Sequence, residues 1–258
     1  KGPKRGIATD NIMTMPEILA PMDLALFAIP FVTAPLSLLS SAYIVYLILS
    51  QRSDKHRSKP REHILLGMSL LDIFFSFALS FSTTPGPAIM DEKLPTFGTV
   101  GTCSAQGFFV QVGMGAPLYN ACLCIYYLLR VRYKVSDDYL MRWAVPSMHA
   151  LILTFSMSTA VASLSMGLFN YAGVMGCWIH DANALCDDDP QYCDRGQRAE
   201  EFEIYFALIH IVLCFLFVSV SMGVLWWTVR QTEVKSRRWR LGGNSDISSG
   251  GGVGGNSK

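Results

Sequence analysis

The sequence contains seven cysteines, and the first question is which of them can form disulfide bonds. Four lie at the ends of long apolar stretches or between them, at Cys103, Cys177, Cys186 and Cys193. In an oxidising compartment these can pair, and four cysteines allow three pairings. We favour Cys103–Cys177 together with Cys186–Cys193, while the other pairings and free thiols stay open as alternatives. The remaining three lie inside apolar stretches, where cysteine is most simply a packing residue, at Cys122, Cys124 and Cys214.

A second group of polar residues lies within the apolar stretches themselves. Asp72 is the most informative, because a carboxylate at the centre of a membrane helix costs roughly 2.5–3.5 kcal/mol and usually faces a partner or water. Counted along helices, Asn120 lies at a depth similar to that of Asp72, and His149 lies slightly shallower. We therefore expect a polar cluster of Asp72 and Asn120, with His149 as a further member. The simpler alternative is a hydrogen bond between helices that has no role in switching.

Three polar residues end the third apolar stretch, namely Arg130, Arg132 and Tyr133. Arginines at the end of a membrane helix often extend to the polar interface and anchor the helix there. The functional alternative is a contact point for a cytoplasmic partner, or a lock between helices within the membrane. The sequence leaves both interpretations open.

The sequence lacks the short motifs of common catalytic sites. It contains no HExxH zinc motif, no GxSxG nucleophile motif, no glycine-rich phosphate loop and no His/Cys spacing typical of a metal site. The formal net charge of +1 gives no indication of a nucleic-acid partner. We therefore expect a protein that is not an enzyme and that holds no metal or cofactor.

Five long stretches with few charges must position these residues. Each reaches the roughly 20 residues that cross a bilayer core, and they cover residues 24–49, 63–84, 103–129, 143–171 and 202–229. We predict an all-α transmembrane bundle of five spans over residues 24–240. Residues 1–23 are expected to form an extracellular tail, and the Gly/Ser-rich residues 241–258 a disordered cytoplasmic tail.

Local composition adds two expectations about these spans. In the third stretch, Gly113, Gly115 and Pro117 predict a kink near the middle. In the fourth stretch, many small residues follow Ser156. Because small residues let membrane helices approach closely, this span should pack tightly against its neighbours.

The orientation follows from the lysines and arginines. They concentrate in residues 51–62, 130–142 and 230–240, and cytoplasmic connections carry an excess of such residues. We expect these three segments in the cytoplasm, and the N-terminus and the acidic run at residues 187–189 outside. The chain should then be a multi-pass integral membrane protein, most simply of the plasma membrane.

Several short motifs resemble those of the seven-transmembrane G-protein-coupled receptors. Residues 69–72 (Ser-Leu-Leu-Asp) look like the small-residue-x-x-Asp motif of the second span. Cys103 with Cys177 matches the disulfide that joins the third span to the second outer loop in that superfamily. Three further matches favour the cyclic-AMP-receptor-like and secretin/adhesion-like branches, at residues 177–178 (Cys-Trp), 143–146 (Trp-Ala-Val-Pro) and 127–128 (Tyr-Leu). Residues 131–133 resemble Asp-Arg-Tyr, but they lie too far from Cys103 for that role to be carried over.

The resemblance covers spans one to five and implies an incomplete seven-span receptor. Such a receptor would pass the signal of an extracellular ligand to a cytoplasmic partner, with a heterotrimeric G protein as a candidate. The ligand pocket would lie between the third span, the Cys177 loop and the fifth span, and its candidate residues are Gln106, Gln111, Trp178 and His210. Two other functions stay open. One is half of a transporter or channel, because five spans can form one inverted repeat, and the other is a five-span membrane protein without a ligand.

Overall fold

The computed structural model describes residues 21–53, 59–87, 96–173, 176–182 and 194–247. Within these residues, five helical segments are long and apolar enough to cross a membrane, which confirms the predicted five-span bundle. The segments are Ala28–Ser50, Pro60–Ser80, Val100–Val131, Asp137–Ser165 and Ala199–Val234.

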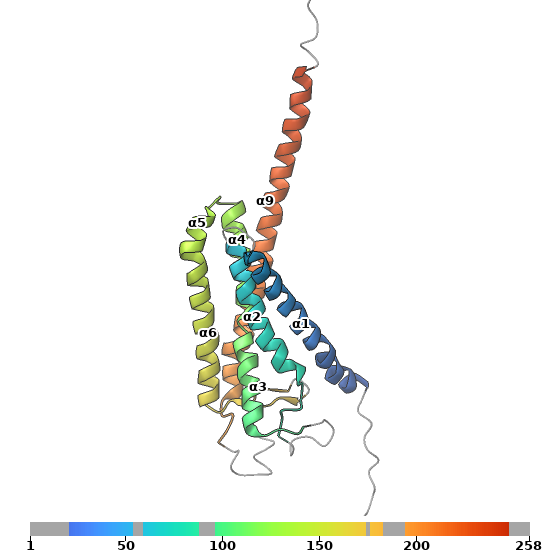
Figure 1. Ribbon diagram of the computed structural model, residues 1–258, viewed down its shortest axis with the longest axis vertical. Coiled ribbons are helices and arrows are strands. Elements are labelled where there is room, and N and C mark those ends of the chain that lie inside the picture. Colours follow the sequence, from blue (N-terminus) through green and yellow to red (C-terminus); the bar gives the residue numbers. More distant parts are fainter. Residues whose placement is uncertain (1–20, 54–58, 88–95, 174–175, 183–193, 248–258) are drawn as a thin grey trace, which may run out of the picture.

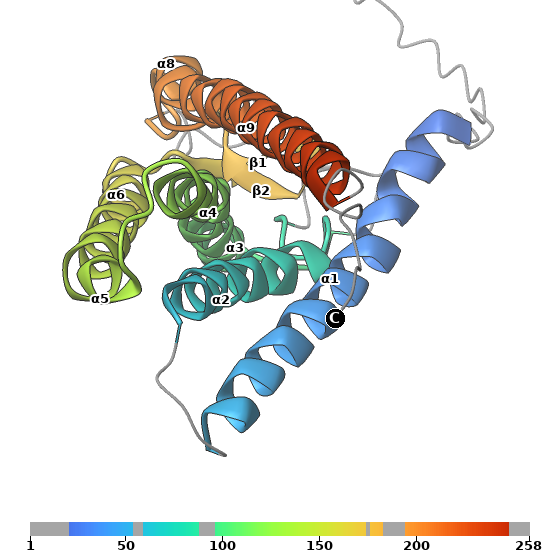
Figure 2. The same cartoon turned by 90° about the horizontal axis from the view of Figure 1, so that it is seen from above.

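The first two spans are α1 (Pro21–Ser53) and α2 (Pro60–Ser80). α2 begins with Pro60, where the missing N–H group removes no helical hydrogen bond. The Glu62 carboxylate accepts the backbone N–H of Lys59 at 3.2 Å and so satisfies a donor at the same helix end. α1 packs mainly on α2 and diverges from the other helices toward its N-terminal end (Figures 1 and 2).

The third span consists of two helices, α3 (Val100–Gly113) and α4 (Ala116–Val131), which confirms the predicted break. Both glycines at the break lie where a side chain has no room. A Cβ on Gly113 would collide with Phe75 of α2, and one on Gly115 would collide with Ser156 of the fourth span. The glycines therefore allow three spans to approach one another at the level of the break.

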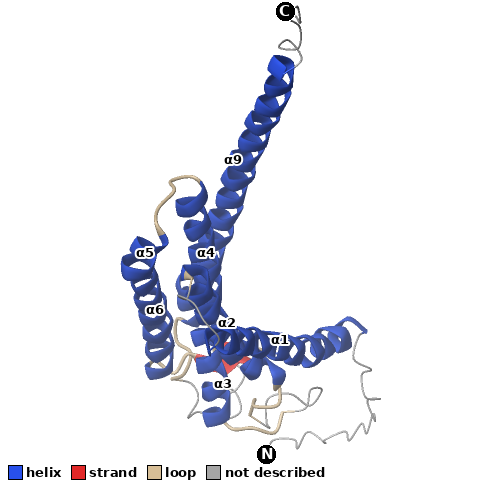
Figure 3. Cartoon of the chain, turned by 45° about the horizontal axis from the view of Figure 1, so that its top comes forward, coloured by secondary structure: helices blue, strands red, loops and turns tan. Residues whose placement is uncertain are grey.

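The fourth span is built from α5 (Asp137–Tyr139), the π-helical turn η1 (Leu140–Ala144) and α6 (Val145–Ser165). The apolar stretch continues to residue 171, but the helix ends earlier than the sequence predicts. Gly167 adopts a φ of +65°, which ends a helix at low cost only for glycine. The next residues form strand β1 (Phe169–Tyr171), which pairs antiparallel with β2 (Cys177–Ile179). Figure 3 shows this hairpin beside α3.

The fifth span comprises α8 (Ala199–Glu203), the π-helical turn η4 (Ile204–Leu208) and α9 (Ile209–Ile247). α9 extends well beyond the bundle (Figure 1). The helix includes residues 241–247, where the sequence predicts a disordered tail. Helix propagation explains this, because each added residue of an existing helix gains a hydrogen bond without a new nucleation cost.

Burial follows the pattern expected of membrane helices. Small polar residues of α6, including Ser156, Thr159 and Ser163, are buried, whereas large apolar residues such as Leu151 and Val161 are exposed. The predicted close packing of the fourth span is therefore confirmed on its side facing α3. The main core forms where α2, α4 and α6 meet, and its most buried members are Ile64, Leu71, Tyr119, Leu140, Ile152 and Ala160.

The two ends of the bundle differ in structure. The β1–β2 hairpin and the start of α3 lie at the lower end in Figure 1. The end of α4 and the C-terminal part of α9 lie toward the upper end (Figure 1). The lysine- and arginine-rich segments after the third and fifth spans therefore share one end of the molecule, opposite the hairpin.

Candidate functional site

A disulfide bond between Cys103 and Cys177 joins the start of α3 to β2, which confirms the favoured pairing of these two cysteines. Both are almost completely buried, with 2% and 1% of their surface exposed. The predicted Cys186–Cys193 bond lies outside the described residues. Cys122, Cys124 and Cys214 are free thiols, in keeping with their interpretation as packing residues. The disulfide fixes the hairpin against the third span.

Gln106 lies one turn further along α3 and connects three elements. Its Nε2 donates to the backbone oxygens of Ala78, at 3.0 Å, and Ser82, at 2.7 Å, where α2 ends. Its Oε1 accepts the N–H of Cys177 in β2 at 2.9 Å. The side chain is 5% exposed, so these are buried hydrogen bonds that are costly to lose.

Gln111 makes a similar connection deeper in the bundle. Its Oε1 accepts the indole N–H of Trp178 at 3.1 Å, and its Nε2 donates to Thr159 Oγ1 of α6 at 3.2 Å. Gln111 is 1% exposed. β2, α3 and α6 are therefore joined through one amide side chain.

Three of the four predicted ligand contacts thus come together around the hairpin. Gln106 and Gln111 are buried and use their amide groups on other parts of the protein, while Trp178 is partly buried between them and the surface. The structure gives them a positioning role, and their role as ligand contacts stays a prediction. His210 lies apart from them in α9, where its ring packs against Phe155 of α6 with ring centroids 5.2 Å apart.

Arg195 is a member of the hairpin network that the sequence reading missed. Its Nη2 donates to Ser104 Oγ of α3 at 3.3 Å and to the Phe169 carbonyl at 3.2 Å, while Nε donates to Asn170 Oδ1 at 3.2 Å. It therefore ties the segment before α8 to the hairpin and to α3. In the sequence it is one basic residue in an acidic segment, and no spacing distinguishes it from a solvated charge.

Asp72 finds its partners on α1. Its Oδ2 accepts hydrogen bonds from Ser37 Oγ at 2.9 Å and from Ser41 Oγ at 2.5 Å. No hydrogen bond joins it to Asn120, although both are described and both line one cavity of about 570 Å³ beside the break in the third span. The predicted cluster is therefore wrong about which residues satisfy the carboxylate, although Asp72 and Asn120 line the same cavity.

His149 does not belong to the Asp72 group, and its inclusion in that cluster is corrected. Its Nδ1 is 2.6 Å from Tyr119 Oη, which joins α6 to α4. Tyr119 is 1% exposed and its ring fills the space beside Gly67 of α2. His149 is therefore paired with Tyr119, whereas Asp72 is paired with serines of α1.

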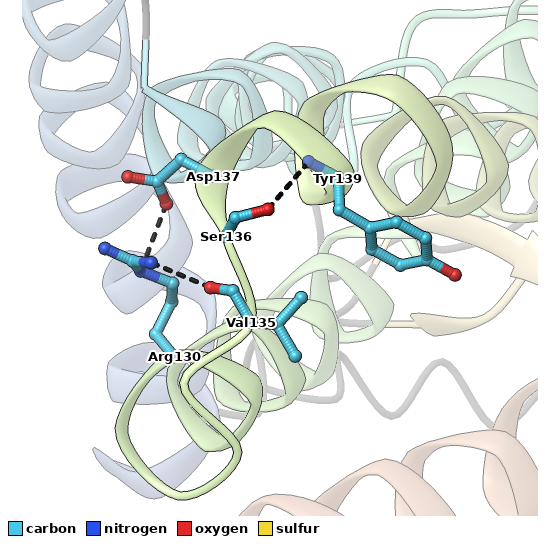
Figure 4. A network of polar contacts seen from close by, with 5 residues as sticks. All are labelled: Arg130, Val135, Ser136, Asp137 and Tyr139. Carbon is cyan, nitrogen blue, oxygen red and sulfur yellow. Dashed lines mark hydrogen bonds and ion pairs between the residues drawn. The ribbon is translucent and has the colours of Figure 1, made fainter.

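The far end of the third span is held by an ion pair (Figure 4). Arg130 Nε is 3.1 Å from Asp137 Oδ1, and Arg130 Nη1 donates to the Val135 carbonyl at 2.7 Å. The arginine therefore closes the turn between α4 and α5. Arg132 and Tyr133 are exposed beside it, and Tyr133 is 71% exposed. The three residues that the sequence groups together thus divide into one structural and two surface positions.

No protein-family model matches this sequence, and no curated protein matches it as a relative. In the described part of the chain, no group of three or more His, Cys, Asp or Glu residues is arranged to hold a metal ion.

Proposed function

We propose that this chain is a G-protein-coupled-receptor-like membrane protein, which transmits an extracellular signal along its third span to a cytoplasmic partner. One observation carries the proposal. The third span is in direct contact with the hairpin through Cys103, Gln106 and Gln111, and its other end is held by a partly exposed ion pair between Arg130 and Asp137. The third span thus has one firmly held end at the hairpin and one weakly held end at Arg130.

The break between α3 and α4 provides a place for movement. A ligand that contacts the hairpin would move α3 through the disulfide and the two glutamines. α4 can change its angle to α3 at Met114 and Gly115, which lie between the two helices. A ligand shifts such an equilibrium only by its difference in affinity for the two arrangements. The cytoplasmic partner would respond to this rearrangement at the end of the span that contains Arg130.

The same proposal assigns the orientation and the partners. The end with the disulfide-linked hairpin would face the oxidising exterior, and the lysine- and arginine-rich end would face the cytoplasm of a plasma-membrane protein. Arg132 and Tyr133 would then be accessible to a heterotrimeric G protein. α1 and α9 expose broad apolar surfaces, which two further spans would partly cover in a seven-span receptor.

Basal coupling in cells tests the proposal without a known ligand. Full-length protein would be expressed with energy-transfer sensors for each Gα family. Replacing Asp137→Asn should release Arg130 and change basal coupling by about fivefold or more for at least one family. Arg142→Ala is the matched control, because Arg142 lies at the same end and its guanidinium carbon lies over the Trp143 ring, 5.9 Å from the ring centroid, with no ion pair to another described residue. If neither the wild type nor the Asp137 variant activates any sensor, the receptor proposal is wrong.

A transporter remains the second candidate because of one observation. The Asp72 cavity lies beside the break in the third span, and transporters place ion and substrate sites at interrupted helices. Asp72→Asn should then abolish uptake or current in vesicles and leave G-protein sensors unchanged. The receptor proposal expects no transport in either protein.

A further inference from the structure

A second cavity lies away from the third span's polar contacts, between α4, α6 and α9. Its volume is about 1000 Å³, at the upper end of the range typical of small-molecule sites. Its base contains buried residues such as Ala121 and Ile152, and its rim contains exposed ones such as Leu151 and Leu213. The cavity therefore opens onto the apolar surface that the bilayer would cover.

One histidine lines this apolar cavity. His210 is 8% exposed, and its ring nitrogens have no side-chain hydrogen-bond partner among the described residues. The backbone of Phe206, one turn earlier, interacts with the ring and can satisfy one nitrogen. A buried polar group without a partner is costly, so the other nitrogen indicates a missing partner.

Water is a poor partner at this position. A buried water needs two to four polar neighbours, and most residues that line the cavity are aliphatic or aromatic. The lining residues also include no lysine, arginine, aspartate or glutamate. A phosphate or carboxylate headgroup would therefore lose its hydration without meeting an opposite charge. The chemistry fits a neutral apolar molecule with one hydrogen-bonding group.

We propose that this cavity binds a membrane-dissolved alcohol of sterol size, whose hydroxyl group forms a hydrogen bond with His210. The rigid apolar body would pack on Ile152, Phe155 and Phe217, and the ligand would enter from the bilayer through the exposed rim. The site is separate from the hairpin and does not depend on the receptor proposal.

Photolabelling in lipid nanodiscs tests this site directly. Full-length protein in phosphatidylcholine would be labelled with a cholesterol analogue that carries a diazirine and an alkyne, and the labelled peptides would be identified by mass spectrometry. Labels should map to α4, α6 and α9, and unlabelled cholesterol should compete. 5-Cholestene, which has the same rings but no hydroxyl group, should compete about tenfold less well.

Two substitutions of His210 separate the contribution of the hydrogen bond from that of packing, and a third substitution fills the cavity. His210→Phe keeps an aromatic ring and should weaken competition by cholesterol about tenfold, whereas His210→Gln keeps a hydrogen-bonding group and should retain most of it. Ala121→Phe fills the base of the cavity and should abolish labelling there. All three variants would first be checked for wild-type melting temperatures.

Several results would overturn the proposal. Equal competition by cholesterol and 5-cholestene would mean that the cavity holds only hydrocarbon. Unchanged labelling in a folded His210→Phe variant would exclude the histidine as the anchor. Crosslinks from this face to a second copy of the chain would assign the surface to a dimer contact instead.

Discussion

At the hairpin end of the third span, Gln106 is 5% exposed and makes three hydrogen bonds to α2 and β2 beside a disulfide. At the opposite end, the side chain of Arg130 is 38% exposed and interacts with Asp137, with the Val135 carbonyl and with the Tyr126 side chain. Solvent weakens an exposed ion pair, whereas buried amide contacts are costly to break. The same span is thus fixed firmly at one end and weakly at the other.

This difference is what a transmitting element requires. A firmly held end converts a contact on the hairpin into movement of the helix, and a weakly held end can exchange partners at little cost. A protein with only a structural role has no need for the asymmetry. Substitutions at each end can measure how strongly that end is held. Equal losses of stability at the two ends would contradict the difference between them.

Removal of the disulfide should have the largest effect. Cys103→Ser should lower the free energy of unfolding by about 3 kcal/mol, because the bond closes a loop between residues 74 positions apart. The melting temperature in detergent, followed by tryptophan fluorescence, would measure the loss. Reducing agent should lower the melting temperature of the wild type more than that of the variant, which already lacks the Cys103–Cys177 bond. Cys122→Ser is the control, since Cys122 is a free thiol.

The Gln106→Leu substitution should lower the free energy of unfolding by about 2–3 kcal/mol, nearly as much as loss of the disulfide. The leucine is of similar size but leaves the carbonyls of Ala78 and Ser82 and the N–H of Cys177 without their buried partner. Hydrogen exchange should accelerate in the hairpin and at the end of α2. Gln197→Leu is the matched control, because Gln197 is exposed and should change stability by less than about 0.5 kcal/mol. Equal effects in the two variants would show that the hairpin end is not specially held.

A substitution in the middle of the bundle should lower stability by an amount between the losses at the two ends of the third span. Ser41→Ala removes one of two hydrogen bonds to the Asp72 carboxylate and should cost about 1.5–2 kcal/mol. In a double-mutant cycle with Asp72→Asn, the two substitutions should couple by about 1 kcal/mol. Ser40→Ala is the control, because Ser40 is exposed and its hydroxyl donates to the Ser37 carbonyl rather than to Asp72. Additive effects of Ser41 and Asp72 would contradict the contact.

The sequence predicts the firmly held end better than the middle. The Cys103–Cys177 bond and the break at Gly113–Gly115 follow from residue types whose chemistry has few alternatives. Hydropathy likewise predicts the five spans, because long apolar stretches have few other uses in a folded chain.

The partners of Asp72 could not be predicted in the same way. Ser37 and Ser41 lie four residues apart and so share one face of α1, but that face meets Asp72 only because of how α1 crosses α2. Hydropathy determines that two helices span the membrane and leaves their crossing angle and rotation undetermined. Arg195 escaped prediction for a similar reason, since its three contacts come from α3 and β1, which are distant in sequence.

The weakly held end should give the smallest change in stability. Arg130→Ala removes the ion pair with Asp137 and the contact with the Val135 carbonyl, yet the exposed pair should contribute no more than about 1 kcal/mol. Its effect should instead be local. Spin labels on either side of the turn between α4 and α5 should report a broader distance distribution, and the wild type should move toward the variant as salt screens the pair. Arg132→Ala removes an exposed charge that makes no ion pair with another described residue, so it should leave the distribution unchanged. A loss of stability equal to that of Gln106→Leu would show that both ends of the span are held equally, and the proposed transmission along the span would lose its structural support.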